Sequence, residues 1–343
     1  MEKINLIQVG FGRVGRAFFE LLKEKYDYCS GHYGLKLELR GLVRSQGAII
    51  LSSTKRVLNP SYFATDDLQY LSDWIPAITL SDLLDEFSPG VVVDCTPSDL
   101  KTGEPGFSLM KEALAKGWHV VTASKGALAN HPTELSDLAR KNKVAIKASG
   151  ATAAALPALD VGLYSLAGTE ILAIEGVLNG TTNYILTRMT EGLTYNQALE
   201  EAREKGIAEP DSSQDIEGWD TAVKMILIAN QVLGTSIKLN EVKVAGIQGI
   251  SREVIDKTNS LEKVLKLFGK CYREDCASPW KVEVGLALLD YDHPLATVNG
   301  TNKGIIFYTD SMGWVAVTGG KSDPRGAAAA LLKDIINIYF MNF

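Results

Sequence analysis

The sequence predicts an α/β fold in two parts: a Rossmann-type, doubly wound nucleotide domain, then an α+β domain. A glycine-rich turn joins a strand to a helix at the N-terminus, and strand and helix patterns alternate through residues 1–150. An Ala- and Gly-rich segment, Ala148–Pro157, then precedes a different order of elements. We therefore expect a dinucleotide-binding domain at 1–150, a substrate and dimerisation domain at 151–325 and a C-terminal helix at 326–343.

The first element is a short apolar strand, Ile4–Val9, followed by a glycine loop and an amphipathic helix. Gly10, Gly12 and Gly15 have the G-x-G-x-x-G spacing, a weak signal alone that a preceding strand and a following helix strengthen. Such glycines let a dinucleotide pyrophosphate approach the N-terminus of the helix. The residues predicted to bind the cofactor here are Gly10, Phe11, Gly12, Arg13, Val14 and Gly15.

The second strand, Leu37–Val43, should end over the adenosine ribose of the cofactor. A site that prefers NAD usually has Asp or Glu there, whereas this chain has Arg44 and Ser45. A guanidinium can pair with a 2′-phosphate, and Lys55 and Arg56 follow in the next loop. The sequence therefore favours NADP, with NAD possible if Arg44 is only a solvated loop residue.

Two further runs are typical of strands buried on both faces of a parallel sheet. They lie at the start of Val91–Asp99 and of His119–Ala129. Ligands bind beyond the carboxyl ends of such strands. The polar residues expected at that edge are Thr96, Pro97, Ser124 and Lys125. Lys125 could instead be a solvated cation.

The second domain should begin with a long helix after Pro157, then a strand over Glu170–Leu178 and a helix from Thr181. The later apolar runs predict one sheet that covers the substrate pocket and forms a dimer face. Its expected strands are Val242–Ile247, Trp280–Leu289, Gly304–Thr309 and Trp314–Thr318. The sequence closes with a helix, Gly326–Phe340, rich in Ala, Leu and Ile.

One helix carries an ion pair where charge is costly. Trp219–Leu233 is apolar on nearly every face, and its only charges are Asp220 and Lys224, at an i, i+4 spacing that places them on one face. The alternative is an ordinary surface salt bridge. A lysine among apolar neighbours is instead partly desolvated and suits proton transfer. Upstream carboxylates that could join the same cavity are Glu209, Asp211, Asp215 and Glu217.

Composition agrees with a two-domain cytoplasmic enzyme. The chain has 343 residues, of which 46% are hydrophobic and 22% charged. Its net charge of -6 argues against nucleic acid or an anionic membrane as a partner. The first residues predict a strand rather than a leader, and no apolar run is long enough to span a membrane. Four scattered cysteines, expected to be reduced thiols, and four histidines form neither a disulfide framework nor a zinc pattern, so we expect no metal site.

These motifs together resemble the homoserine dehydrogenase family. The segment GIAEPDSSQDIEGWDTAVK (206–224) matches the family signature, and EGVLNGTTNYIL (175–186), VTASKGALA (121–129) and HPLATVNGTNKGI (293–305) occur in the same order. The likeness covers essentially the whole chain. It implies NAD(P)-dependent interconversion of aspartate 4-semialdehyde and homoserine, in the biosynthesis of threonine and methionine. It also implies a short form, without regulatory or kinase domain, whose helix at 326–343 returns to the nucleotide domain.

The resemblance assigns roles to single residues. It implies that Lys224 donates and accepts the proton, that Asp220 binds substrate and orients this lysine, and that Lys125 reaches both cofactor and substrate. Glu209 would hold the substrate ammonium. The residues that it places along the amino-acid pocket are Gly180 and Thr181.

The chain departs from the family pattern at three places. Ser124 replaces an asparagine, and Gly319 opens GGKSD where the family has Gly-Pro-Gly-Ala-Gly, which leaves a cofactor contact at Gly319 in doubt. Lys147 stands where many members have a glutamate near a bound monovalent cation. Two other functions stay open: another semialdehyde oxidoreductase, which would need an activated thiol such as Cys95, and a nucleotide-sensing relative without activity.

Overall fold

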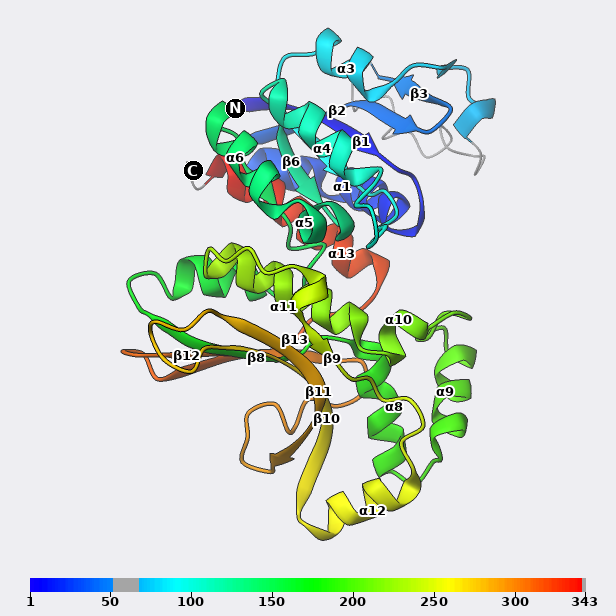
Figure 1. The fold of residues 1–343 in the computed structure, drawn as a ribbon. Helices are drawn as coiled ribbons and strands as arrows, with labels where there is room; N and C mark the ends of the chain where they lie inside the picture. The colour runs from blue at the N-terminus through cyan, green and yellow to red at the C-terminus, as the bar shows by residue number, and fades with distance from the viewer. Residues whose placement is uncertain (52–67, 341–343) are drawn as a thin grey trace. The chain divides into compact units, whose positions relative to one another are not determined.

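The structure is a computed structural model that describes residues 1–51 and 68–340. The chain divides into two compact units (Figure 1). The first unit consists of Met1–Ala154 and Asp323–Phe343, and the second of Ala155–Ser322. Among the described helices, none is long and apolar enough to cross a membrane.

The first unit contains a sheet of seven strands in the order β4-β3-β2-β1-β5-β6-β7. Five neighbouring strands are parallel, and β3 and β4 extend the sheet as an antiparallel edge. The strands are β1 Glu2–Val9, β2 Leu35–Arg44, β3 Gly47–Ile50, β4 Trp74–Pro76, β5 Val91–Asp94, β6 His119–Thr122 and β7 Ile146–Lys147. The apolar runs of β1, β2, β5 and β6 are buried because helices cover both faces of the sheet.

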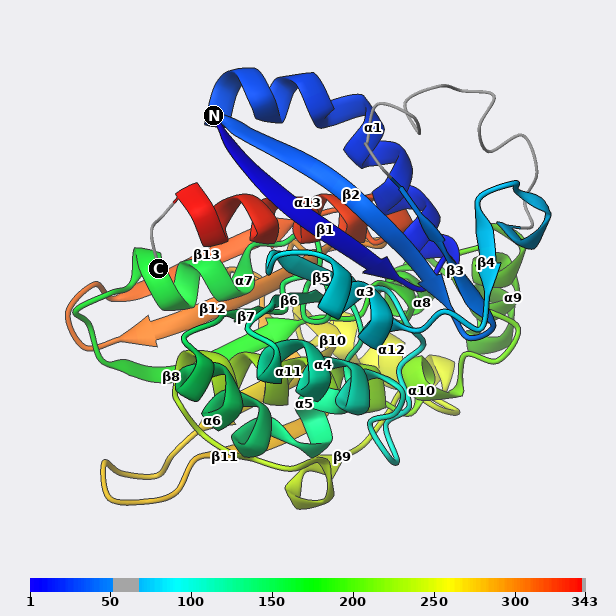
Figure 2. The same ribbon diagram turned by 90° about the horizontal axis from the view of Figure 1, so that it is seen from above.

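Figure 2 shows α1 and α13 on one side of this sheet and α3, α4 and α6 on the other. The doubly wound fold is therefore confirmed. Leu331 and Ile335 of the last helix share a core with Phe18 and Leu22 of the first, although about 310 positions separate them in sequence. The helices of this unit include α1 Arg13–Tyr33, α3 Leu80–Glu86, α4 Gly106–Ala115, α5 Gly126–Asn130, α6 Pro132–Asn142 and α13 Pro324–Phe340.

The second unit contains a sheet of six strands in the order β13-β12-β8-β10-β11-β9. The strands are β8 Ile171–Val177, β9 Lys243–Val244, β10 Lys263–Tyr272, β11 Lys281–Asp290, β12 Lys303–Thr309 and β13 Trp314–Gly319. The apolar helix α11 packs on this sheet where Gly269 of β10 leaves room for Met225. The main helices are α8 Gly180–Thr190, α9 Tyr195–Glu204, α10 Ser213–Ile216, α11 Trp219–Val232 and α12 Arg252–Ser260.

Three elements of the second unit differ from expectation. The helix expected after Pro157 is present but shorter than predicted: α7 (Ala158–Asp160) continues into one π-helical turn (Val161–Ser165) and ends there. The strand expected at Val242–Ile247 is reduced to β9, which pairs with β11 at two positions. Strand β10 was not expected, because its lysines hide the alternation of apolar residues.

Candidate active site

The glycine loop joins β1 to α1, and its three glycines lie in different surroundings. Gly10 has a φ of +92°, and a Cβ there would lie 2.6 Å from the carbonyl oxygen of Cys95. A Cβ on Gly15 would lie 2.4 Å from the carbonyl oxygen of Gly10, so only glycine lets α1 start this close to the loop. Gly12, the N-cap of α1, faces open space. The loop thus offers backbone N–H groups at a helix N-terminus to an anion such as a pyrophosphate.

The side chain of Gln8 in β1 holds this loop by two hydrogen bonds, which the sequence did not predict. Its Nε2 atom donates to the carbonyl oxygens of Gly10 and Gly15, each at 2.9 Å. A polar residue inside the apolar strand β1 was the available signal. The predicted cofactor residues in the loop and the first turn of α1 are Phe11, Arg13 and Val14.

Arg44 and Ser45 lie beside the loop, at the carboxyl end of β2. The carbonyl oxygen of Val43 accepts the N–H of Gly10 at 2.9 Å, and both Arg44 and Ser45 are exposed in the turn to β3. A Rossmann fold places the adenosine ribose of its dinucleotide at this edge. Outside the described residues lie the two other expected cations, Lys55 and Arg56.

The carboxyl ends of β5 and β6 are tied together by Asp94, which is buried. Its carboxylate accepts the Thr96 hydroxyl at 2.6 Å, the Thr96 N–H at 2.9 Å and the Thr122 hydroxyl at 2.7 Å. Burial nevertheless raises the pKa of the Asp94 carboxyl above its ordinary value. Asp94 and Thr122 thereby fix the turns that carry the predicted edge residues.

Ser98 completes this edge. Its hydroxyl lies 3.3 Å from the Ser124 hydroxyl and accepts the Lys125 N–H at 2.8 Å. The Ser124 hydroxyl is also 3.4 Å from the carbonyl oxygen of Pro97. The structure thus brings together four predicted residues on two adjacent turns, Thr96, Pro97, Ser124 and Lys125. A serine that the sequence reasoning passed over links the two turns.

The ion pair on α11 is formed and largely buried. The Lys224 ammonium donates to Asp220 Oδ2 at 2.5 Å and to the carbonyl oxygen of Leu178 at 3.1 Å. The two side chains are only 14% and 12% exposed. The surface-pair alternative is therefore wrong, and the ammonium is held by one carboxylate and one carbonyl oxygen in a poorly hydrated place.

Asn179, which the sequence reasoning did not select, organises the carboxylates around that pair. Its Nδ2 atom donates to Asp215 at 2.6 Å and to Asp220 at 2.8 Å, and its Oδ1 atom caps α8 by accepting the Thr182 N–H at 2.9 Å. Burial first, and then the charge of Asp220, raise the pKa of the Asp215 carboxyl, while Lys224 opposes this shift. One amide therefore ties the N-terminus of α8 to the ion pair on α11.

Two of the other expected substrate residues, Gly180 and Thr181, lie at the N-terminus of α8, and Glu209 lies on a different loop. Thr181 is buried and donates to the carbonyl oxygen of Ile207 at 3.2 Å. Gly180, the first residue of α8, is buried. Glu209 is exposed on the loop between α9 and α10. Gly319, which is predicted to contact the cofactor, ends β13 with a φ of +112°.

The turn after Lys147 is closed by its own side chains. The carbonyl oxygen of Ala148 accepts the backbone N–H and the hydroxyl of Thr152, at 3.1 and 3.2 Å, and that of Ser149 accepts the same hydroxyl at 3.2 Å. The Ser149 N–H and hydroxyl donate to buried Asp334 of α13, at 2.9 and 2.8 Å. The carbonyl oxygens of Ala148 and Ser149 are therefore occupied by protein donors.

Two family models match the chain. The model described as the NAD binding domain of homoserine dehydrogenase matches residues 10–148, and the model described as homoserine dehydrogenase matches residues 157–336. The chain belongs to the homoserine dehydrogenase family. The expected resemblance is thus confirmed, and with it an oxidoreductase that acts on a CH–OH group and uses a nicotinamide dinucleotide.

Several relatives and solved structures in the homoserine dehydrogenase family resemble this chain over most of its length. The homoserine dehydrogenase of Methanocaldococcus jannaschii is 36% identical over 98% of each chain. The NAD(+)-dependent homoserine dehydrogenase of Pseudomonas canavaninivorans is 33% identical over 99% of this chain and 97% of its own. The crystal structure of the S. aureus homoserine dehydrogenase at pH 6.0 superposes with a TM-score of 0.76 at 28% identity, over 100% of this chain and 77% of its own.

Proposed function

We propose that this member of the homoserine dehydrogenase family interconverts L-homoserine and L-aspartate 4-semialdehyde and prefers NADP to NAD. The observation that carries the reaction is the buried Lys224–Asp220 pair, which Asn179 ties to the N-terminus of α8. The exposed Arg44 at the end of β2 supports NADP, because its guanidinium can pair with a 2′-phosphate. The functional division we propose is a dinucleotide-binding domain at 1–150, a substrate domain at 151–325 and a returning helix at 326–343.

In the oxidation of homoserine, the neutral amine of Lys224 would take the proton from the hydroxyl oxygen while a hydride leaves the carbon that bears this hydroxyl. In the reverse direction the Lys224 ammonium would return the proton to that oxygen. When bound, the nicotinamide supplies the hydride acceptor or donor. Asp220 orients the lysine and contacts substrate, and Lys125 helps polarise the oxygen. Glu209 would pair with the substrate ammonium. Lining the amino-acid pocket are Gly180 and Thr181.

A thiol-dependent semialdehyde oxidation fits this chain poorly. It would need an activated cysteine, yet burial, and then the adjacent Asp94, raise the pKa of the Cys95 thiol well above its ordinary value. The carbonyl of Cys95 instead packs against Gly10 of the cofactor loop. We therefore assign Cys95 a structural place.

Steady-state oxidation of homoserine, followed by the absorbance of the reduced cofactor, tests the proposal. We expect turnover with both cofactors and a higher kcat/KM with NADP. A higher kcat/KM with NAD would contradict the cofactor preference alone. Cofactor binding without any turnover would contradict the catalytic function and support a nucleotide-sensing protein.

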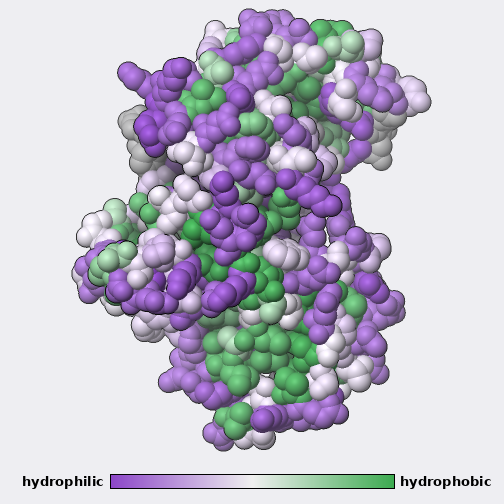
Figure 3. All heavy atoms as spheres, in the orientation of Figure 1, coloured by the Kyte–Doolittle hydropathy of each residue, from purple (hydrophilic) through white to green (hydrophobic). Residues whose placement is uncertain are grey.

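We further propose a cytoplasmic homodimer. Figure 3 shows hydrophobic residues at the surface over the second unit. Large apolar side chains exposed on its strands are Leu172, Leu286, Leu288 and Trp314. Exposed apolar side chains on sheet strands are typical of association surfaces. Light scattering coupled to size exclusion should give twice the mass of the 37.2 kDa chain.

Replacing Asn179 with serine should lower kcat/KM for homoserine about tenfold while keeping the protein's stability. Serine caps a helix as well as asparagine does. It cannot bond both carboxylates as the Asn179 amide does, and the loss of one such charge-assisted bond is worth about 1.5–3 kcal/mol. The Asn179→Ala variant, which also loses the cap, should melt at a lower temperature. Full activity in the serine variant would show that the bridge is dispensable.

Activity should not depend on sodium or potassium when tetramethylammonium chloride holds the ionic strength constant. Lys147 stands where relatives that bind such an ion are expected to have a glutamate, and a fixed cation would repel the ion at close range. The carbonyl oxygens of Ala148 and Ser149 are also occupied by Thr152. A saturable, several-fold activation by either ion would contradict this prediction.

A further inference from the structure

Lys266 is a buried lysine in the middle of β10, in the second unit. It is 1% exposed, and its neighbours Leu265 and Leu267 are buried too. Burial lowers the pKa of Lys266 to about 8. A lysine at such a position costs stability relative to an apolar residue of similar volume. The presence of Lys266 therefore indicates a role other than packing.

The ammonium of Lys266 is held by neutral oxygens from two other elements. It donates to Asn183 Oδ1 of α8 at 3.0 Å, to the carbonyl oxygen of Val298 at 2.5 Å and to Asn299 Oδ1 at 3.0 Å. Among the described residues no carboxylate lies within ion-pair distance of it. All three N–H donors are used, so Lys266 joins strand, helix and loop at one point.

The loop 298–302 belongs to the motif HPLATVNGTNKGI, to which the proposed reaction gives no role. Side chains of α8 hold this loop along its length. Asn183 Nδ2 donates to the carbonyl oxygens of Val298 and Asn302, at 3.0 and 3.1 Å, and the Gly300 N–H donates to the Thr187 hydroxyl at 3.1 Å. Polar bonds to α8 therefore fix this loop in place.

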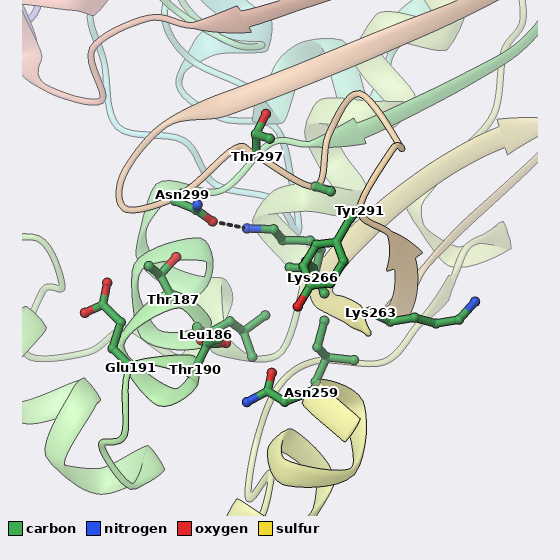
Figure 4. Close-up of a pocket in the computed structure, with 13 residues that line it drawn as sticks. Leu186, Thr187, Thr190, Glu191, Asn259, Lys263, Lys266, Tyr291, Thr297 and Asn299 are labelled. Atoms are coloured by element: carbon green, nitrogen blue, oxygen red, sulfur yellow. Dashed lines mark hydrogen bonds between the residues drawn. The ribbon is translucent and has the colours of Figure 1, made fainter. Parts of the chain in front are cut away.

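One side of the loop 298–302 borders a cavity, so packing alone does not hold the loop in place. This cavity of about 270 Å³ lies beside the loop, and Thr187, Thr297 and Asn299 line it. Figure 4 shows Lys266 bonded to Asn299 at the wall of this cavity. Because this side of the loop faces a hollow, its position depends on the bonds to Lys266, Asn183 and Thr187.

The other end of the loop covers the first residue of α8. A Cβ built on Gly180 would lie 2.9 Å from the carbonyl oxygen of Thr301 and 3.1 Å from the Ser322 hydroxyl, which itself lies 3.2 Å from that oxygen. Gly180 is followed by Thr181 and preceded by Asn179, which bonds Asp220. A shift of the loop would therefore displace Gly180 and its neighbours, where the amino-acid pocket is proposed.

We propose that Lys266 is a positioning residue for the amino-acid pocket: through Asn183 and residues 298–302 it fixes the loop that packs on Gly180 at the start of α8. This rests on the proposed function for the place of the pocket. Lys266 takes no part in proton transfer, and it acts within the second unit, so the nucleotide-binding loop of the first unit is not affected.

The Lys266→Met variant tests this proposal, because methionine keeps the apolar stem and removes the ammonium. We expect KM for homoserine to rise about tenfold, as the loss of one or two hydrogen bonds predicts, with an unchanged Kd for the cofactor. Lys263→Met is the matched control. Lys263 lies on the same strand and lines the same cavity, but it pairs with Asp290 rather than with the loop.

Amide hydrogen exchange gives a readout that does not depend on activity. In Lys266→Met, peptides covering 296–303 and 179–186 should both exchange faster than in the wild type, and in Lys263→Met neither should change. Thr187→Val, which removes the acceptor of the Gly300 N–H without touching a charge, should give the same pattern more weakly and serves if Lys266→Met does not fold. A wild type that does not oxidise homoserine would contradict the proposed function, while the exchange experiment would still test the link between loop and helix.

Two results would overturn the inference. One is a lower melting temperature for Lys266→Met and Thr187→Val with unchanged KM and unchanged exchange at 179–186, which would make the network purely structural. The other is a loss of cofactor affinity equal to the rise in KM, which would place the effect outside the amino-acid pocket.

Discussion

Lys224→Ala is expected to lower kcat for homoserine oxidation by about 100-fold or more while the Kd for the cofactor stays unchanged. The proposed mechanism gives Lys224 the reacting proton, and the structure shows its ammonium bonded to Asp220 and to the Leu178 carbonyl in a largely buried place. Stopped-flow and steady-state rates from pH 7 to 10 measure the effect.

The partner of this lysine provides a graded comparison. Asp220→Ala should lower kcat less severely, because the lysine remains and only its orientation is lost. Circular dichroism of each variant checks that α11 is retained. Near-wild-type turnover of Lys224→Ala across that pH range would show that the acid/base assignment is wrong.

Arg44→Ala is expected to weaken binding of NADP(H) about 10- to 100-fold and to leave NAD(H) nearly unaffected. Only NADP carries the 2′-phosphate, and a charge-assisted hydrogen bond to it contributes about 1.5–3 kcal/mol. Fluorescence titration of both reduced cofactors, at one salt concentration, gives the two Kd values directly.

Arg40→Ala is the matched control for this variant. Arg40 lies on the same strand, where its Nε atom donates to Asn5 at 2.8 Å, inside the sheet rather than at its carboxyl edge. The Arg40→Ala variant should therefore leave the ratio of the Kd values for NADP(H) and NAD(H) unchanged. Equal losses for NADP(H) and NAD(H) in Arg44→Ala would show that this arginine is structural.

Local spacing in the sequence predicts those parts of the candidate site that neighbouring residues form. Three glycines between a strand and a helix predict the dinucleotide loop, because only glycine accepts both the φ of Gly10 and the close contact at Gly15. The i, i+4 spacing predicts that Asp220 and Lys224 meet, because a helix places such residues on one face. Local geometry follows from neighbouring residues, so sequence suffices for it.

The sequence did not predict elements whose pattern is set by distant neighbours. Strand β10 was missed since its buried Lys266 interrupts the apolar alternation, and only the acceptors on α8 and in the loop 298–302 make a lysine tolerable there. The helix after Pro157 is shorter than predicted, because it ends at Ser165 in one π-helical turn.

The groups that surround the Lys224–Asp220 pair come together only through tertiary packing. Leu178 lies 46 positions before Lys224, and Asn179 lies 41 positions before Asp220, yet both hydrogen-bond to this pair. Asp334 likewise holds Ser149 across 185 positions. Contacts of this kind form when separate elements pack, and a hydrogen bond between them leaves no periodic mark in the chain, because either partner alone is an ordinary polar residue.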